Sequence, residues 1–326
     1  MREVQFREAV REAMSEEMRS DDNIFMLGEE IAEYDGAYKV TAGMSQEFGT
    51  DRVVDTPISE LGFAGIGVGA AMNGMRPIVE FMTWNFAILA MDQIINNAAK
   101  IRYMSGGQFD IPITFRGPNA QAGQLAATHS QAFESIYAHV PGLKVIAPAD
   151  PYDAKGLLKS AIRDDDPIVF LESEKMYGDK GEIPDGEYVL PVGKAQIKRE
   201  GSDITLISWG KILKEVFKTA DELAKDGIQA EVIDVRTIRP LDYRTLVDSV
   251  KKTNRAVVIE ESWPQASMAS EIGFKLQFEG FDHLDAPVAR VTQADTPFPF
   301  AHDLIEQSVP NVERIMKACK DVLYLG

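Results

Sequence analysis

Residues 53–83 read VVDTPISELGFAGIGVGAAMNGMRPIVEFMT, and this stretch decides the fold. The short runs at 53–55 and 76–83 are rich in β-branched and apolar residues, which is typical of strands. Between them, residues 60–74 have helical character although five of them are glycine. A strand, a helix and a second strand in this order predict neighbouring parallel strands in an α/β protein.

Glu60 opens the predicted helix, and fifteen residues without a charge follow it. A carboxylate beside such an apolar run is costly to bury unless another group pairs with it. Each glycine inside a helix costs about 1 kcal/mol relative to alanine. Five of them therefore need a reason, such as close approach of the backbone to another helix or to a ligand. The alternative for Glu60 is an acid that is favoured at the helix N-terminus by the helix dipole.

The alternation of strands and helices continues on both sides of this stretch. Asp150 followed by Pro151 predicts the start of a helix, and residues 176–195, rich in Gly, Pro and Asp, predict a linker. We therefore predict an α/β fold with two open, largely parallel sheets, helices on both faces, and domains at 1–180 and 195–326. The other expected elements include helices at 85–105 and 129–140 and strands at 24–28, 111–117, 143–149, 167–173, 203–210, 230–238, 256–262 and 286–292.

The charge balance restricts the possible partners. The chain has 34 Lys and Arg against 51 Asp and Glu, which gives a net charge of −17. An acidic surface disfavours nucleic acid and anionic membranes, so we expect neither as a partner. The first ten residues lack the apolar core of a signal peptide, and the single cysteine, Cys319, cannot form an internal disulfide. We expect a bacterial cytoplasmic protein without a transit peptide.

Generic motifs add little. GIGVGA at 65–70 fits G-x-G-x-x-A, but it lies inside the helical run and no acidic ribose partner follows at the usual distance. The four histidines are far apart and have no spacing typical of metal sites. RDDDP at 163–167 places three carboxylates in a predicted turn, where a solvated turn is the simpler interpretation and a divalent cation site the alternative.

Several longer runs together carry a resemblance over essentially the whole chain. The runs are residues 53–83, FRGPN (115–119), THSQAFE (128–134), PGLKVIAPADPYDAKGLLKSAIRDDDP (141–167) and EVIDVRTIRPLD (231–242). In them the sequence strongly resembles the beta subunits of thiamine-diphosphate-dependent 2-oxo acid dehydrogenases, above all the pyruvate type. The resemblance implies a pyrimidine-binding domain followed by a transketolase-like C-terminal domain. It also implies decarboxylation of pyruvate and reductive acetylation of lipoyl groups, together with an alpha subunit.

The resemblance also assigns site residues. Glu60 matches the activating glutamate, whose carboxylic acid bonds to the pyrimidine ring and favours its imino tautomer; a dry pocket suits this role because burial raises a carboxyl pKa. His129 would orient or protonate the intermediate, or guide acyl transfer to lipoamide. Phe86 would stack on the aminopyrimidine, and Glu29 is a further candidate for the cofactor pocket. Without the resemblance, His129 and Phe86 would be ordinary capping or packing residues. Leu89 departs from the glutamine of many relatives, which puts one minor pocket contact in doubt.

Ions and partners follow from the same resemblance. The Gly-Asp-Gly motif that binds magnesium and diphosphate has no match here, because PDGEY (184–188) and KDG (225–227) do not fit it. We therefore expect thiamine diphosphate to be shared with an alpha subunit that carries the magnesium, two alpha and two beta chains, and docking of a lipoyl acyltransferase core. A potassium site built from main-chain carbonyls is implied at Ile113, Ala161, Ile162, Asp164 and Asp166.

Alternatives remain at this point. The chain could be the beta subunit of a branched-chain 2-oxo acid or acetoin dehydrogenase, although FMTWNF (81–86) and YMSGGQFDIP (103–112) favour the pyruvate type. It could be a non-catalytic assembly subunit, against which Glu60 and His129 argue. A stand-alone C-terminal portion of a transketolase-like enzyme would need a basic cluster for substrate phosphates, and no clear one is present.

Overall fold

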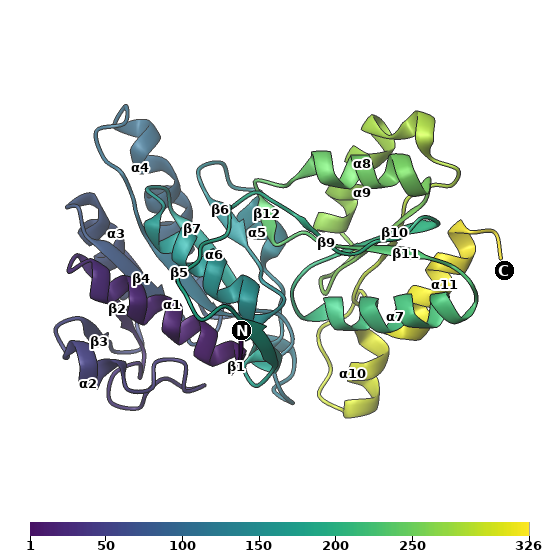
Figure 1. Ribbon diagram of the computed structural model, residues 1–326. Coiled ribbons are helices and arrows are strands. Elements are labelled where there is room, and N and C mark those ends of the chain that lie inside the picture. Colours follow the sequence, from purple (N-terminus) through teal and green to yellow (C-terminus); the bar gives the residue numbers. More distant parts are fainter. Residues whose placement is uncertain (326) are drawn as a thin grey trace. The chain divides into compact units, whose positions relative to one another are not determined.

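The computed structural model describes residues 1–325 and contains two compact units, each with its own sheet (Figure 1). The first unit comprises residues 1–122 and 136–192, and the second comprises residues 123–135 and the chain from residue 193 onward. Both sheets are open and largely parallel, which confirms the predicted fold class. No helix within residues 1–325 is long and apolar enough to cross a membrane.

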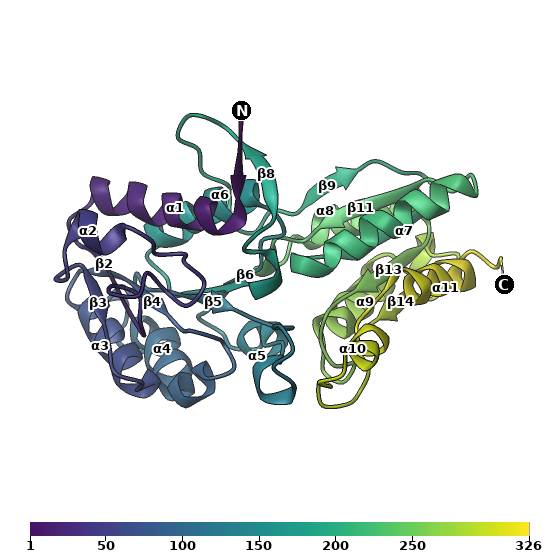
Figure 2. The same ribbon diagram turned by 90° about the horizontal axis from the view of Figure 1, so that it is seen from below.

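The sheet of the first unit is parallel, and its strands follow the order β6–β7–β5–β4–β2–β3. Helices cover both faces, so most strand residues are buried and the strands are largely apolar runs. Figure 2 shows α1 and α6 on one face and α3 and α4 on the other. The strands are β2 (Ile24–Gly28), β3 (Val53–Asp55), β4 (Arg76–Glu80), β5 (Thr114–Pro118), β6 (Lys144–Ile146) and β7 (Ile168–Glu172).

The helices of this unit begin largely where the sequence predicts. The Asp150 carboxylate accepts the backbone N–H of Asp153 at 2.8 Å, and Pro151 is the first helical residue of α6, as expected for a capped helix. Burial of the α1 and α6 faces against each other then fixes both helices to the sheet. Their bounds are α1 (Phe6–Ser20), α2 (Met44–Phe48), α3 (Glu60–Met72), α4 (Ala99–Met104) and α6 (Pro151–Arg163).

The prediction of a continuous α-helix over 85–105 is wrong. The segment consists of a 3-10 turn, η1 (Ala87–Ala90), a π-helix, η2 (Asp92–Ala98), and α4. Asp92 accepts the side-chain amide of Asn96 at 2.7 Å, and its carbonyl accepts that of Asn97 at 3.3 Å. Such side-chain bonds compete with regular backbone pairing, and π-helical turns are frequent at functional sites.

The helix expected over 129–140 is also much shorter than predicted. Residues Ala127–His129 form a 3-10 turn, η3, and only Glu134–Ala138 are α-helical, as α5. The segment expected as a linker contains β8 (Lys180–Ile183), which pairs antiparallel with β1 (Arg2–Gln5). The 3-10 turn η4 (Glu174–Met176) precedes β8.

The second unit has the strand order β14–β13–β10–β11–β9, with β9 antiparallel to β11 and the other pairs parallel. The strand expected over 230–238 is interrupted because Arg236 has a left-handed backbone, with φ of 59°. The elements are β9 (Gln196–Arg199), β10 (Ile204–Ser208), η5 (Gly210–Ile212), α7 (Leu213–Lys225), β11 (Ala230–Asp234), β12 (Thr237–Arg239), α8 (Tyr243–Thr253), β13 (Ala256–Ile259), α9 (Met268–Glu279), η6 (Phe281–His283), β14 (Ala289–Val291), α10 (His302–Ser308) and α11 (Val312–Val322).

Candidate active site

The carboxyl edge of the first sheet collects several of the predicted site residues. Gly28, the last residue of β2, pairs with Asp55 at the end of β3 and with Glu80 at the end of β4. The chain continues from Gly28 into Glu29, and α3 starts at Glu60 after the same edge. Open parallel α/β sheets bind their ligands outside this edge.

Glu29 and Glu60 form a buried pair of acids. Glu29 is 7% exposed and Glu60 is 4% exposed. Burial, together with the negative charges of Glu60 and Glu30, raises the pKa of Glu29 to about 7. One carboxylate oxygen of Glu29, Oε1, has no hydrogen-bond partner within residues 1–325. The pair therefore offers an acid that changes charge near neutral pH and an oxygen that can accept a bond from a ligand.

The backbone beside Glu29 is held by its neighbours. The Asp55 carboxylate accepts the N–H groups of Ala32 at 2.7 Å and Glu33 at 3.0 Å, which ties the loop after β2 to the end of β3. A Cβ on Gly28 would lie 2.6 Å from the Glu80 carbonyl oxygen, so only glycine allows β2 and β4 to approach this closely. Glu29 is thus presented by a fixed turn.

Phe86 belongs to the same unit and follows a tight turn after β4. The Phe86 N–H donates to the Thr83 carbonyl at 3.1 Å, and the Asn85 amide donates to the Thr83 hydroxyl at 2.7 Å. Beneath the turn, the fully buried Trp84 ring packs on Tyr137, with centroids 4.9 Å apart. Phe86 itself is 37% exposed, and Leu89 is 62% exposed. Phe86 is therefore a partly exposed aromatic residue on a rigid base.

A buried charge cluster under this edge was missed by the sequence analysis. Arg116 on β5 is fully buried and donates to Glu172 at 2.6 and 2.5 Å and to Glu80. Burial raises the pKa of Glu80, and the Glu172 charge adds to the increase, whereas Arg116 opposes it. Tyr177 donates its hydroxyl to Glu172 at 2.8 Å. A lone arginine in an apolar strand, with acids ending the strands on either side, was the available signal.

His129 lies in the second unit rather than in the first with Glu29, Glu60 and Phe86. Its Nδ1 is 3.0 Å from the Thr128 hydroxyl, and its backbone N–H donates to the Ala126 carbonyl at 3.3 Å. Ala126 has φ of 64° and ψ of −156°, a conformation that residues other than glycine rarely adopt. Such strain costs about 1–3 kcal/mol and concentrates at functional sites.

A cavity of about 410 Å³ lies beside His129 in the second unit. Two segments line it, one with Ala127, Thr128 and Gln131 and one with Asp295, Thr296 and Pro297. Trp263 completes the lining. The sequence analysis did not single out this second group, because its members are brought to the His129 loop only by the folded chain.

The carbonyls expected to bind potassium lie around the end of α6. The carbonyls of Ile162 and Asp164 accept bonds from Arg76 at 3.2 and 3.1 Å. The Ala161 carbonyl accepts the Asp164 N–H at 3.3 Å, and that of Ile113 accepts the first N–H of β7 at 2.9 Å. Each carbonyl oxygen has a second lone pair, so these bonds leave room for a cation ligand.

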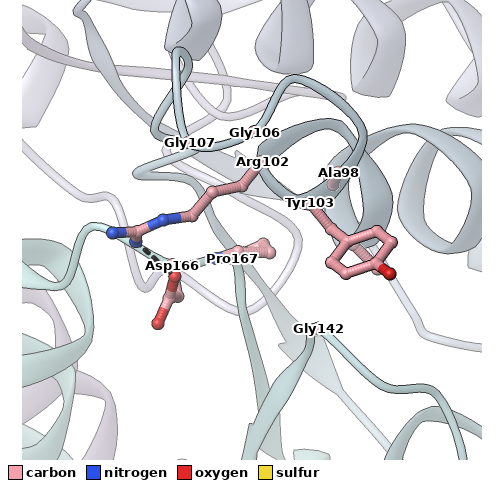
Figure 3. A pocket seen from close by; sticks show the side chains of 9 residues that line it. Ala98, Arg102, Tyr103, Gly106, Gly107, Gly142, Asp166 and Pro167 are labelled. Atoms are coloured by element: carbon pink, nitrogen blue, oxygen red, sulfur yellow. Dashed lines mark hydrogen bonds and ion pairs between the residues drawn. The ribbon is translucent and has the colours of Figure 1, made fainter.

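The side chains around these carbonyls include more carboxylates than cationic groups, so their net charge is negative. Arg102 donates to the Asp166 carboxylate at 2.6 Å (Figure 3). The same carboxylate lies 3.0 Å from the Lys144 ammonium. A cavity of about 490 Å³ opens beside Arg102 and Asp166. The group contains four carboxylates (Asp110, Asp164, Asp165 and Asp166) against three cationic side chains (Arg76, Arg102 and Lys144).

Comparisons with known proteins show which family the chain resembles. Residues 2–180 match the transketolase pyrimidine-binding domain, and residues 193–315 match the transketolase C-terminal domain. The chain is 55% identical to the pyruvate dehydrogenase E1 component subunit beta of Rhizobium meliloti, over 98% of this chain and 69% of that protein. It is 51% identical to the protein of the same name from Rickettsia felis, over 99% of both. The chain belongs to the pyruvate dehydrogenase E1 beta-subunit family.

Membership of the pyruvate dehydrogenase E1 beta-subunit family confirms the resemblance seen in the sequence. The chain is accordingly part of a thiamine-diphosphate-dependent enzyme. The mitochondrial beta-2 subunit of Oryza sativa is also 51% identical, over 99% of this chain and 87% of that protein. A solved chain called a split gene transketolase, in an inactive beta4 tetramer, matches with a TM-score of 0.80 over 99% of both chains. Its identity of 20% supports the fold alone.

The residues at the first sheet edge fit the pyrimidine end of this cofactor. An aminopyrimidine carries ring nitrogens and an amino group, which need a carboxyl partner and an acceptor oxygen. Glu60 and Glu29 supply two buried carboxyl groups, and Glu29 Oε1 is without a protein partner within residues 1–325. The exposed ring of Phe86 suits the flat heterocycle.

Proposed function

We propose that this chain, together with an alpha subunit, decarboxylates pyruvate and reductively acetylates lipoyl groups. The observation that carries the proposal is the buried Glu29–Glu60 pair at the carboxyl edge of the first sheet. When bound, thiamine diphosphate supplies the carbon nucleophile and the electron sink of this reaction. The protein has to position that group and set the protonation state of its pyrimidine ring.

Each site residue then has a distinct task. The Glu60 carboxyl group bonds to a pyrimidine ring nitrogen and exchanges a proton with it. Glu29 accepts a bond from the pyrimidine edge through its oxygen. Phe86 stacks on the ring, and His129 orients or protonates the reacting fragment.

The alpha subunit covers α3 and the turn after β4 in this proposal. Ile58, Ile66 and Leu89 are 82%, 64% and 62% exposed there. A helix that is apolar on all sides is normally buried, and a cluster of exposed apolar side chains indicates a protein interface. We assign the diphosphate and magnesium to the alpha subunit, in an assembly of two alpha and two beta chains.

The second unit carries a separate surface that suits the lipoyl acyltransferase core. On α9 and the turn after it, Phe278 and Phe281 are both 75% exposed, and the acids Glu279, Asp282 and Asp285 lie in the same segment. Apolar side chains among acids favour a basic, partly apolar binding module.

The single cysteine supports the bacterial cytoplasm as the compartment, which we retain as a proposal.

Potassium remains part of the proposal. The carbonyls of Ile113, Ala161, Ile162, Asp164 and Asp166 would bind it at the end of α6, where the helix dipole is negative. Bound potassium should raise the melting temperature of the purified chain in potassium chloride relative to lithium chloride at equal ionic strength.

The decisive experiment replaces Glu60 in the assembled enzyme. Glu60→Gln should lower pyruvate turnover with an artificial electron acceptor by about 10²–10⁴-fold, because an amide cannot exchange the required proton. The control is Glu30→Gln, which alters an exposed acid next to Glu29 and should retain activity within about twofold.

The same assay separates the alternatives. Undiminished activity of Glu60→Gln would identify the chain as an assembly subunit without a catalytic role. Faster turnover of 2-oxoisovalerate than of pyruvate by the wild-type complex would move the substrate assignment to branched-chain 2-oxo acids. Wild-type turnover of pyruvate with the loss in Glu60→Gln supports the proposal.

A further inference from the structure

The buried charges around Arg116 have no task in the function proposed so far. Arg116 is 0% exposed and bonds to Glu80 and Glu172, and Tyr177 completes the group, which we call the Arg116 cluster. Removing three charges from water is costly, and apolar replacements of buried ion pairs are often equally or more stable. Stability alone is therefore a weak reason for this cluster, and a second reason lies in what it holds in place.

The Arg116 cluster joins the ends of three neighbouring strands at the carboxyl edge of the first sheet. Arg116 lies in β5, between Glu80, the last residue of β4, and Glu172, the last residue of β7. Its guanidinium donates to both oxygens of Glu172, at 2.6 and 2.5 Å, and its third nitrogen donates to Glu80. Because the guanidinium fork is planar and rigid, it fixes the two carboxylates relative to each other, which a lysine ammonium on its flexible stem cannot do.

Glu80 in turn touches the segment that presents Glu29. We call residues 29–43, which follow β2, the Glu29 loop. A Cβ built on Gly28 would lie 2.6 Å from the Glu80 carbonyl oxygen, and one built on Gly36 would lie 3.8 Å from the Glu80 carboxylate oxygen Oε1. Gly28 immediately precedes Glu29, and Gly36 follows it. Glu80, which Arg116 holds, therefore packs against the chain on both sides of Glu29.

Two tyrosines connect the Arg116 cluster to the far part of the Glu29 loop. Tyr177, which donates its hydroxyl to Glu172 at 2.8 Å, packs its ring against that of Tyr38 with centroids 5.2 Å apart. Tyr38 belongs to the loop and donates its hydroxyl to Glu174 at 3.1 Å. Arg7 donates to the carbonyls of Tyr177 and Tyr38, at 3.2 and 3.3 Å. The cluster thus holds the loop at a second point.

The backbone of the Glu29 loop needs such support. Three of its residues other than glycine have left-handed conformations, namely Glu30, Asp35 and Lys39, with φ of 57°, 62° and 60°. Strained backbone of this kind persists only where the surrounding structure over-determines it. Without the contacts to Glu80 and Tyr177, the loop would relax, and the Glu29 side chain would move with it.

We propose that Arg116 is a positioning residue for the pyrimidine pocket: through Glu80 and Glu172 it holds the Glu29 loop in the conformation that places the Glu29 carboxyl group beside Glu60. The inference rests on the proposed function, in which Glu29 accepts a bond from the pyrimidine edge. Arg116 is fully buried and bonded inside its cluster, so it acts through Glu29 and not on the reacting atoms.

The first test follows the titration of Glu29 in the full chain without cofactor. Burial, together with the charges of Glu60 and Glu30, raises the pKa of Glu29 to about 7. The stability gained by Glu29→Gln therefore grows as the pH rises from about 4.3 to about 7. Arg116→Lys keeps the positive charge but loses the fork, so Glu29 should leave its buried environment. In this background the shift of the urea midpoint caused by Glu29→Gln at pH 8 should fall to less than about half of its wild-type size.

A matched control alters another buried cation of the same unit. Lys155 is 2% exposed and bonds to Glu16 at 2.6 Å and to Glu12 at 3.1 Å. Lys155→Arg makes the reverse exchange of cations and should leave the effect of Glu29→Gln unchanged, whatever it does to overall stability. A purely structural role of Arg116 predicts this same result for Arg116→Lys, and that outcome would overturn the inference.

Tyr177→Phe keeps the test decisive if Arg116→Lys does not fold. The substitution removes only the hydroxyl that donates to Glu172 and leaves the ring that packs on Tyr38. The effect of Glu29→Gln at pH 8 should again be smaller than in the wild type. If it were unchanged in Tyr177→Phe, the cluster would not position Glu29.

The assembled enzyme provides an independent readout. Arg116→Lys should raise the thiamine diphosphate concentration for half-maximal pyruvate turnover by about tenfold, the change expected for one lost hydrogen bond, while kcat at saturating cofactor stays within about threefold. A lower kcat at an unchanged cofactor requirement would contradict a positioning role.

The titration also separates this inference from the proposed function, because it needs neither cofactor nor pyruvate. A wild-type complex without pyruvate turnover would reject the proposed function, and a reduced Glu29→Gln effect in Arg116→Lys would still support the link from Arg116 to Glu29. An unchanged effect together with normal wild-type turnover would reject the inference alone.

Discussion

Glu29 occupies a position that is unfavourable for a carboxylate. Burial, together with the charge of Glu60, raises its pKa to about 7, whereas a glutamate in an unfolded chain titrates near pH 4.3. Between these two values the unfolded chain releases a proton that the folded chain retains. The free energy of unfolding therefore falls as the pH rises from about 4.3 to about 7. Such a cost is expected where a ligand later bonds to the group.

Removing the charge should relieve this cost. We expect Glu29→Gln, in the chain without its alpha partner, to unfold with a free energy about 2–3 kcal/mol higher than wild type at pH 8. The difference should shrink as the pH falls and vanish below about pH 4, where Glu29 is protonated in the folded and in the unfolded chain. Urea denaturation at several pH values measures it, with Glu30→Gln as the control. A difference that is constant with pH would contradict the burial of an ionisable Glu29.

At the level of single residues, the resemblance identified more of the site than the chemistry of the sequence did. Glu60 was suspected from its apolar surroundings, and its 4% exposure agrees with that argument. Arg116 was overlooked because its partners, Glu80 and Glu172, are 36 and 56 residues away in the sequence. The roles of Glu29, Phe86 and His129 stay predictions, since geometry alone does not assign them.

Among the secondary-structure elements, α3 contains glycines with two different functions. A Cβ on Gly67 would lie 2.7 Å from a methyl group of Val79 and 3.1 Å from one of Ile113. A Cβ on Gly69 would meet nothing within 4 Å. Gly67 therefore allows α3 to pack closely on the sheet, whereas Gly69 leaves open space on another side of the helix. The sequence predicted a close approach but could not say which glycine made it.

The two glycines should respond oppositely to alanine. We expect Gly67→Ala to lower the free energy of unfolding by about 1–3 kcal/mol, because the added methyl group overpacks the interface with β4. Gly69→Ala should raise it by up to about 1 kcal/mol through helix propensity. Urea denaturation of the isolated chain measures both values. Equal effects of the two substitutions would show that neither position depends on packing.

Element boundaries were predictable where local chemistry decides them. The Asp150–Pro151 cap could be predicted from the sequence because Asp150 and Asp153, which its hydrogen bond joins, are only three positions apart. The π-helix at 92–98 was not readable, since apolar periodicity does not distinguish a π-helix from an α-helix. The pairing of β1 with β8 joins residues that are about 180 positions apart, and short edge strands carry little periodic signal.

For the molecule as a whole, the sequence predicted two α/β units but not how segments distribute between them. Residues 123–135, which include His129, belong to the second unit although the chain returns to the first unit at residue 136. Contacts made after folding, such as the hydrogen bond from Gln124 to the Phe300 carbonyl at 3.3 Å, decide this. The exposed apolar side chains on α3 are typical of a surface that another protein chain covers.

Assembly should therefore be sensitive to a charge on α3. Ile66 is 64% exposed in this chain, so Ile66→Glu should change the free energy of unfolding by no more than about 0.5 kcal/mol. In the complex the same carboxylate would be buried without a partner, and association with the alpha subunit should weaken at least about tenfold. Sedimentation velocity of mixed subunits measures the association. The matched control, Val189→Glu, adds the same charge at another exposed apolar position, 46% exposed, and should assemble normally. If Ile66→Glu assembled as tightly as wild type, the alpha subunit would have to bind elsewhere, and the cofactor could not be shared across α3.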